Sequence, residues 1–187
     1  MRTTVMVVVA VLGAGLGLSV AQPAAAEERT CRGSLGAVTV DNLRVPQGAT
    51  CTLNGTRVQG TIKIERNATL RASGVRVIGN VQGENAANVR VVTASSVGGS
   101  IQVVQGGAAR VADSVVGGDI LFDDNTRALS AVRNDVGGNL QAFQNTGGVA
   151  ISHNTIDGNL QCKENRPAPT GGGNIVHGSK EDQCARL

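Results

Sequence analysis

Apolar and polar residues alternate in short runs that return every 19 or 20 residues between Val58 and Gly178. The frame is clearest in residues 136–142, where Val136, Leu140 and Ala142 are separated by glycine or polar residues. Because successive residues of a strand point to opposite faces, this alternation predicts a half-buried strand in every repeat. A fixed period of this length is typical of a solenoid, in which each repeat forms one coil.

Equivalent positions of successive repeats carry the same kind of side chain. One glycine anchors each repeat: Gly60, Gly79, Gly99, Gly118, Gly138, Gly158 and Gly178. Two residues after these glycines stand Ile62, Val81, Ile101, Ile120, Leu140 and Leu160. A second alternating run, such as Val89-Arg90-Val91, precedes each glycine. We therefore expect two or three short strands per coil, stacked in parallel on the next coil, with the glycines at positive φ at the corners.

The composition favours a narrow interior. The chain of 187 residues contains two Phe and neither Trp nor Tyr. The β-branched residues that repeat along it suit strands and fill a slender core. The predicted fold is all-β, a parallel β-helix built from a single chain with coils of about 20 residues. Its winding is expected to be right-handed, because crossovers between parallel strands of one sheet almost always are.

Four segments divide the chain. Residues 1–26 have the features of a secretory signal peptide, namely a basic start, an apolar run and a small-residue cleavage site at Ala24–Ala26. Residues 27–59 are predicted to form N-terminal capping coils, 60–178 the β-helix repeats and 179–187 the C-terminal cap. The apolar run is shorter than the ~20 residues of a membrane span. We therefore expect a secreted, extracellular protein whose mature form has no membrane anchor.

Four cysteines in a secreted chain imply two disulfides, which could be paired in three ways. Cys31 and Cys51 are 20 residues apart, and Cys162 and Cys184 are 22 apart. Residues one coil apart in the same column lie about 5 Å from each other, within the range of a disulfide. The period therefore predicts Cys31–Cys51 and Cys162–Cys184, one bridge at each end of the solenoid. The alternative, a zinc site that includes a histidine, would need ligands from opposite ends of a rod.

The charge balance excludes some partners. The sequence carries 17 Lys and Arg against 14 Asp and Glu, and the signal peptide removes one of the basic residues. Such a near balance gives no electrostatic reason to expect nucleic acid or a membrane surface as partner. We expect no cofactor, no resident metal and a monomeric protein.

One column of residues combines groups that could transfer protons. Asp113, Arg133 and His153 stand at the same position of successive repeats. A carboxylate can hold an imidazole in one tautomer and a guanidinium can stabilise an anion, so this column is the candidate catalytic site. The alternative interpretation is an exposed ladder in which Asp113 pairs with Arg133 for a fraction of a kilocalorie.

A cluster of carboxylates is the candidate metal site. Asp119, Asp123 and Asp124 belong to one repeat, and carboxylate oxygens are ligands for calcium. The spacing matches no known calcium loop, and the Asp-Asp-Asn stretch is also typical of a turn.

Two outward columns are candidates for ligand binding. Arg71, Arg90 and Arg110 would form a basic stripe, which could bind acidic polysaccharide or could serve as solvated charges against lateral association of sheets. The second candidate is the set of asparagine and glutamine columns that follow the glycines, which would form either hydrogen-bonded side-chain ladders or a flat face for a repeating polymer. Its glutamines are Gln82, Gln102, Gln141 and Gln161.

In its coil length and its Val-x-Gly-x-Ile/Leu frame, the segment 58–178 resembles the right-handed parallel β-helix repeat proteins. That superfamily includes polysaccharide lyases and hydrolases, so the resemblance implies extracellular polysaccharide as a substrate class, although none of their catalytic motifs is found here. The chain is also similar in outline to bactofilins, which polymerise end to end in the cytoplasm. It differs from them in its secretion signal and its two predicted disulfides.

We therefore expect a secreted, non-catalytic β-solenoid that acts as a structural or binding module in the cell envelope or extracellular space. Its expected partner is an extracellular polysaccharide or another envelope component. The alternative is a polysaccharide-binding or polysaccharide-degrading protein that uses the Asp113 column or the Asp119 group.

Overall fold

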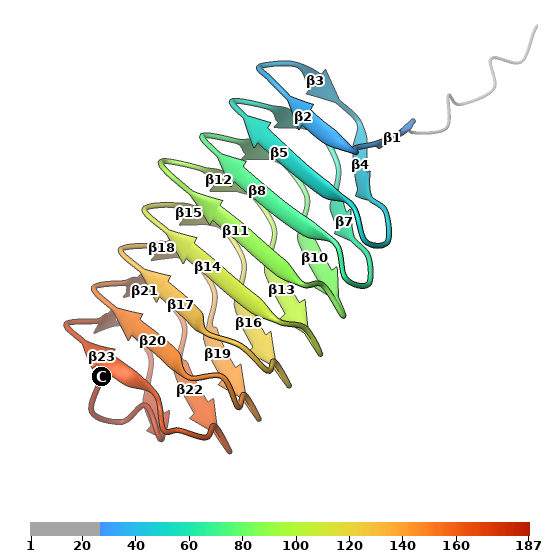
Figure 1. Cartoon of the computed structure of the whole chain (residues 1–187). Coiled ribbons are helices and arrows are strands. Elements are labelled where there is room, and N and C mark those ends of the chain that lie inside the picture. Colours follow the sequence, from blue (N-terminus) through green and yellow to red (C-terminus); the bar gives the residue numbers. More distant parts are fainter. Residues whose placement is uncertain (1–26) are drawn as a thin grey trace, which may run out of the picture.

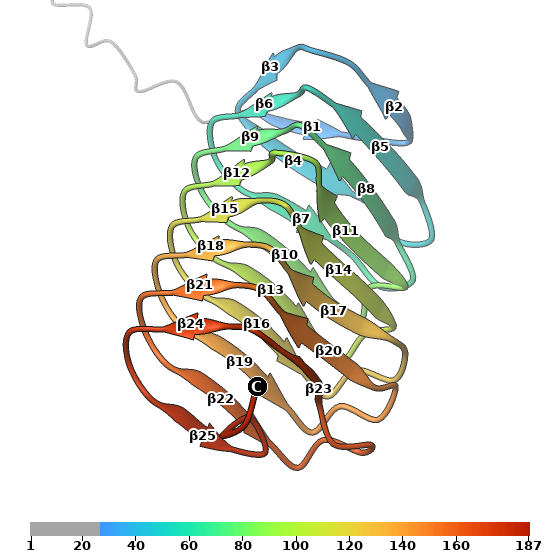
Figure 2. The same ribbon diagram turned by 90° about the vertical axis from the view of Figure 1, so that its left-hand side faces the viewer.

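Residues 27–187, the part of the chain that the computed structural model describes, wind into about eight coils around one axis (Figure 1). Each complete coil contributes one strand to each of three sheets, and all strand pairs are parallel. The coils advance in a right-handed sense, which the two views show from different sides (Figures 1 and 2). The predicted all-β parallel solenoid is confirmed. The predicted signal peptide, 1–26, lies outside the described residues.

Sheet A contains nine strands. In spatial order they are β1 (Glu28–Thr30), β4 (Asn42–Val45), β7 (Ile62–Ile64), β10 (Val81–Glu84), β13 (Ile101–Val104), β16 (Ile120–Asp123), β19 (Leu140–Phe143), β22 (Leu160–Lys163) and β25 (Lys180–Asp182). The seven strands from β7 to β25 are those that the sequence places after the recurrent glycines.

Sheet B contains eight strands. They are β2 (Gly33–Leu35), β5 (Thr50–Asn54), β8 (Thr69–Ser73), β11 (Asn88–Val92), β14 (Ala108–Ala112), β17 (Leu129–Val132), β20 (Val149–Ser152) and β23 (Thr170–Gly172). Sheet C is the narrowest sheet, because its strands are two residues long. They are β3 (Thr39–Val40), β6 (Arg57–Val58), β9 (Arg76–Val77), β12 (Ser96–Val97), β15 (Val115–Val116), β18 (Asp135–Val136), β21 (Thr155–Ile156) and β24 (Ile175–Val176).

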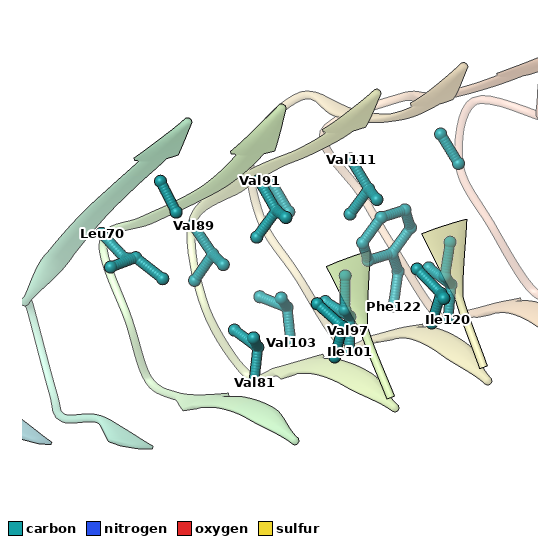
Figure 3. Packing of buried hydrophobic residues seen from close by; sticks show 14 of the residues in the cluster. Leu70, Val81, Val89, Val91, Val97, Ile101, Val103, Val111, Ile120 and Phe122 are labelled. Carbon is teal, nitrogen blue, oxygen red and sulfur yellow. The ribbon is translucent and has the colours of Figure 1, made fainter. Parts of the chain in front are cut away.

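The core is a thin column of apolar side chains that point inward from all three sheets (Figure 3). Ile62, Val81 and Ile101 are partners in register on sheet A, and each is fully buried. Phe122 is the largest fully buried side chain. The column of inward-facing positions on sheet A has a charged residue at each end of the rod. Arg29 is the strand partner of Leu43, and Lys180 is the strand partner of Leu160. Apolar burial therefore stops where the stack of coils stops.

The expectation that the recurrent glycines adopt a positive φ was wrong. These positions require glycine because atoms of the neighbouring coil lie too close for a Cβ atom. None of the seven adopts a positive φ. A Cβ on Gly99 would overlap the side-chain oxygen of Asn80, and one on Gly138 would overlap that of Asp119. A side chain cannot fit because a polar group of the preceding coil already occupies that space.

Positive φ angles occur instead at the other two corners, and mostly on residues other than glycine. Between sheets B and C they include Asp113, Arg133 and His153, at φ of 53°, 53° and 57°. Between sheets A and B they include Asp124 and Gln144, at 53° and 54°. At these corners a residue in the left-handed backbone conformation is followed by a buried polar residue, and the two together turn the chain.

The two predicted disulfides are confirmed, and each joins neighbouring coils. Cys31 and Cys51 have Cα atoms 5.6 Å apart, and Cys162 and Cys184 have Cα atoms 5.2 Å apart. Beyond β25 the chain turns across the end of the rod, where Leu187 packs against the core. Among residues 27–187 there is no helix that could cross a membrane.

Candidate functional site

Hydrogen bonds between coils occupy most of the polar side chains at the three corners. Between sheets C and A, the side-chain oxygen of one coil accepts the backbone N–H of the equivalent residue in the next coil. The acceptors are Asn42, Thr61, Asn80, Ser100, Asp119, Asn139 and Asn159. This confirms the ladder interpretation for the column that follows the glycines. The side chains hold successive coils in register.

Two further ladders are buried, and they were missed in the sequence. Asn125, Asn145 and Asn165 stack between sheets A and B, and the last of them bonds to Gln183. Asn134, Asn154 and Asn174 stack between sheets B and C. Each central amide accepts the backbone N–H of the preceding coil and donates to a backbone carbonyl, as Asn145 does to Phe122 at 3.0 Å. Their spacing of 20 residues was the signal that could have revealed them.

The candidate catalytic column forms an ion pair. The Arg133 guanidinium donates to both carboxylate oxygens of Asp113, at 2.6 and 3.0 Å. That hydrogen bond, with the charge of Arg133, lowers the pKa of Asp113, and the same bond, with the charge of Asp113, raises the pKa of Arg133. Both side chains are about half exposed, at 46% and 57%. Within residues 27–187 His153 has no hydrogen bond to either of them, so the column contains an exposed pair and a separate imidazole.

The three candidate metal ligands lie at opposite ends of one strand. Asp119 precedes β16, and its carboxylate accepts the backbone N–H of Asn139 at 2.6 Å. Asp123 ends β16, and Asp124 follows it. Burial, with the charge of Asp124, raises the pKa of Asp123. No group of three potential metal ligands lies together in the described part of the chain.

The arginine stripe exists as a column in register on sheet B. Arg71 is the strand partner of Arg90, and Arg90 is the partner of Arg110. In the described residues none of the three pairs with a carboxylate, and only Arg110 has a side-chain hydrogen bond, to Ser130 at 3.4 Å. The strands β5, β8, β11 and β14 contain no acidic residue. Like charges therefore follow one another about 4.8 Å apart without an ion pair, although the charge of Arg110 also helps to lower the pKa of the nearby Asp113.

The glutamines on sheet A are partly joined to each other. Gln82 donates to Gln102 at 3.5 Å, and Gln141 donates to Gln161 at 2.7 Å. Leu121 separates these two pairs in the same column.

Two shallow grooves open on sheet A. One, of about 630 Å³, is lined by side chains of both charges, among them Lys63, Glu65 and Glu84. The other, of about 380 Å³, lies beside Phe143 and Lys163, near the end of the solenoid. Neither groove includes the Asp113 column or the arginine stripe.

Comparison of the chain with family models, with curated proteins and with solved structures found no match in any of the three. The likeness to parallel β-helix proteins is therefore one of architecture, which the coils themselves show.

Proposed function

We propose that the protein is a secreted, non-catalytic β-solenoid that serves as a rigid structural or binding module in the cell envelope or extracellular space. The observation that supports this best is the use of its polar side chains. Asp119 is engaged in a ladder and Asp113 is paired with Arg133, while His153 lies apart from that pair, so within residues 27–187 no acid, base and nucleophile converge. Two disulfides at the ends of the rod support an oxidising compartment.

A depolymerisation assay tests the non-catalytic part of this proposal. The mature, disulfide-bonded protein is incubated with a panel of uronic-acid polymers, and product is followed by absorbance and by chromatography. We expect no turnover. Turnover that disappears in His153→Ala or Asp119→Ala would identify an enzyme and overturn the proposal, whereas turnover retained in both variants would point to a contaminant and leave the expectation of no activity in place.

The charges at the two ends argue against a head-to-tail filament. Stacking of β25 on β1 of another copy would place Lys180 and Arg29 in one inward column. Like charges brought together in a poorly solvated column repel, and natural sheets use such charges to prevent edge association. The C-terminal segment that ends at Leu187 also crosses one end of the core.

The arginine stripe favours a second candidate function, the binding of an anionic polysaccharide along sheet B. Arg71, Arg90 and Arg110 form a row in register, and none of them makes an ion pair within residues 27–187. A linear polyanion laid along the axis would pair with these guanidiniums, which bind carboxylate and sulfate groups well. No aromatic side chain lies on sheet B to stack on nucleic-acid bases, since both Phe residues belong to sheet A.

Binding measurements with matched variants test this candidate. Arg90→Gln is expected to weaken binding to polygalacturonate several-fold and to reduce its salt dependence. Lys163→Gln removes one positive charge from sheet A and is expected to leave binding unchanged. Equal losses in the two variants would show unspecific attraction and contradict a site on sheet B.

A further inference from the structure

Sheet C presents a narrow, flat outer face made of two columns of side chains. We call this surface the C face. From the first coil to the last, its first column contains Thr39, Arg57, Arg76, Ser96, Val115, Asp135, Thr155 and Ile175. Backbone hydrogen bonds align its second column, which contains Asp41, Gln59, Ile78, Gly98, Gly117, Gly137, Asp157 and His177. Figure 2 shows the strands of this sheet stacked along one side of the rod.

Exposed apolar side chains of the described residues gather on this face. Ile78, Val115 and Ile175 are 47%, 52% and 60% exposed, and the fourth exposed large apolar residue, Val38, directly precedes β3. The three positions that follow Ile78 in the second column are glycines, so no side chains lie there. A Cβ on Gly98 would lie 2.5 Å from the carbonyl oxygen of Ile78, so the fold excludes one there.

The charges of the C face are separated along the rod. Arg57 and Arg76 lie in early coils, where they outnumber Asp41, whereas Asp135 and Asp157 lie in late coils, where the His177 ring contacts Asp157 at 2.9 Å. The middle of the face carries only Ser96, Val115 and glycine backbone. The face is therefore basic at one end, weakly apolar in the middle and acidic at the other end.

We propose that two copies of this chain pair through their C faces, side by side and antiparallel. A twofold axis midway between β12 and β15 brings the third coil of one copy onto the sixth coil of its partner. Arg76 then faces the partner's Asp135, Ile78 faces the bare backbone at the partner's Gly137, and Ser96 faces the partner's Val115. Each of these contacts occurs twice because the interface is isologous.

The antiparallel arrangement is the one that matches charge. In a parallel pair the twofold axis would run along the rod and bring each coil onto its own equivalent. With the axis midway between the two columns, the first column of one copy would meet the second column of the other. Arg76 would then face the partner's Ile78 and Asp135 would face the partner's Gly137, so neither charge would meet an opposite charge. Opposite charges set the register and direction of such contacts, and the arrangement that leaves these charges without an opposite partner is disfavoured.

The size of the face predicts a weak complex. Eight strands spaced about 4.8 Å and a width of about 10 Å give roughly 400 Å² per partner, half of a standard interface. We therefore expect a dissociation constant of about 10–100 µM, typical of transient pairs. The pair leaves sheet B of both copies open. This goes beyond the proposed function and departs from the monomer expected from the sequence.

Sedimentation equilibrium of the mature, disulfide-bonded protein from micromolar to millimolar concentration tests the proposal. We expect a monomer–dimer equilibrium without larger species, since the twofold contact closes on itself. Arg76→Glu places a carboxylate against the partner's Asp135, and Asp135→Arg places a guanidinium against the partner's Arg76. Each variant alone is expected to weaken dimerisation about tenfold or more.

An equimolar mixture of the two variants is the sharpest arm of this experiment. In the mixed pair both contacts become attractive, so dimers are expected to return to near the wild-type level. Lys163→Glu, a charge reversal on sheet A, serves as the control and should dimerise like the wild type. A monomer at millimolar concentration, a dimer insensitive to both variants, or no recovery in the mixture would each overturn the proposal. The binding assays with polygalacturonate do not depend on this outcome.

Discussion

At the scale of single residues, buried asparagines have the most demanding role. Asn145 is fully buried, and its amide joins three successive coils through Asn125, Phe122 and Asn165. A backbone N–H left without a partner inside the protein costs about 1–3 kcal/mol. The corner geometry therefore depends on the amide and not only on the volume of the side chain.

We predict that Asn145→Ala lowers the free energy of unfolding by about 2–3 kcal/mol, because it leaves the N–H of Asn125 without its acceptor and removes the amide donor to the carbonyl of Phe122. Thermal and urea denaturation would measure the loss. Gln141→Ala is the control, since this partly exposed glutamine bonds only to another side chain, Gln161. It should cost less than about 0.5 kcal/mol. Similar losses in both variants would contradict the role given to the buried ladder.

The Asp113–Arg133 pair predicts a dependence on pH. The hydrogen bond from Arg133 lowers the pKa of Asp113 in the folded protein, so the pair stabilises the fold above the ordinary pKa of aspartate. That contribution disappears as the pH falls through the lowered pKa. We predict that Asp113→Asn slightly lowers the melting temperature at pH 7 and that the difference closes in acid. A difference that grew as the pH fell would contradict this assignment.

At the scale of the elements, the terminal coils are the weak points, because each has a neighbour on one side only. The stability of a solenoid is the sum of the intrinsic stability of each coil and the contacts between neighbouring coils, so the end coils open before the middle ones. The two disulfides lie where this opening would begin. A closed loop of about 20 residues is worth about 3 kcal/mol in the chain-entropy account.

We predict that Cys31→Ser with Cys51→Ser increases hydrogen exchange in the first coil, from β1 to β3. Exchange in the central strands, such as β13 and β16, should stay as in the wild type. Mass spectrometry of peptic peptides would locate the change. A uniform increase along the whole rod would show that the coils open together and would contradict the local role of the bridge.

The sequence predicted the strands, their register and the disulfide pairing, because all three depend on periodicity alone. It did not reveal why the glycines are there. Gly99 and Gly138 are needed because the neighbouring coil lies close to them. The alternation of apolar and polar residues within one coil carries no information about the distance between coils. For the candidate site, it predicted the Arg71–Arg90–Arg110 column and the Asp113–Arg133 pair. It did not reveal that Asp119 accepts a hydrogen bond between coils, because that depends on the ladder around it.

At the scale of the whole molecule, the protein is a short prism with three different faces. Sheet A carries partly paired glutamines and two shallow grooves, sheet B carries the arginine stripe, and sheet C carries the C face with its separated charges. Ends capped by Arg29 and Lys180 oppose growth along the axis. Any assembly is therefore expected to be lateral and limited.

The chain advances along one axis by one strand spacing for every coil. Spin labels on one outward column of sheet B test this advance directly by electron paramagnetic resonance, with labelled protein diluted in unlabelled protein. Thr52 and Ser130 are separated by four coil steps, and Thr52 and Thr170 by six. The account predicts distances of about 19 Å and about 29 Å for these two pairs. A second distance equal to or shorter than the first would contradict it.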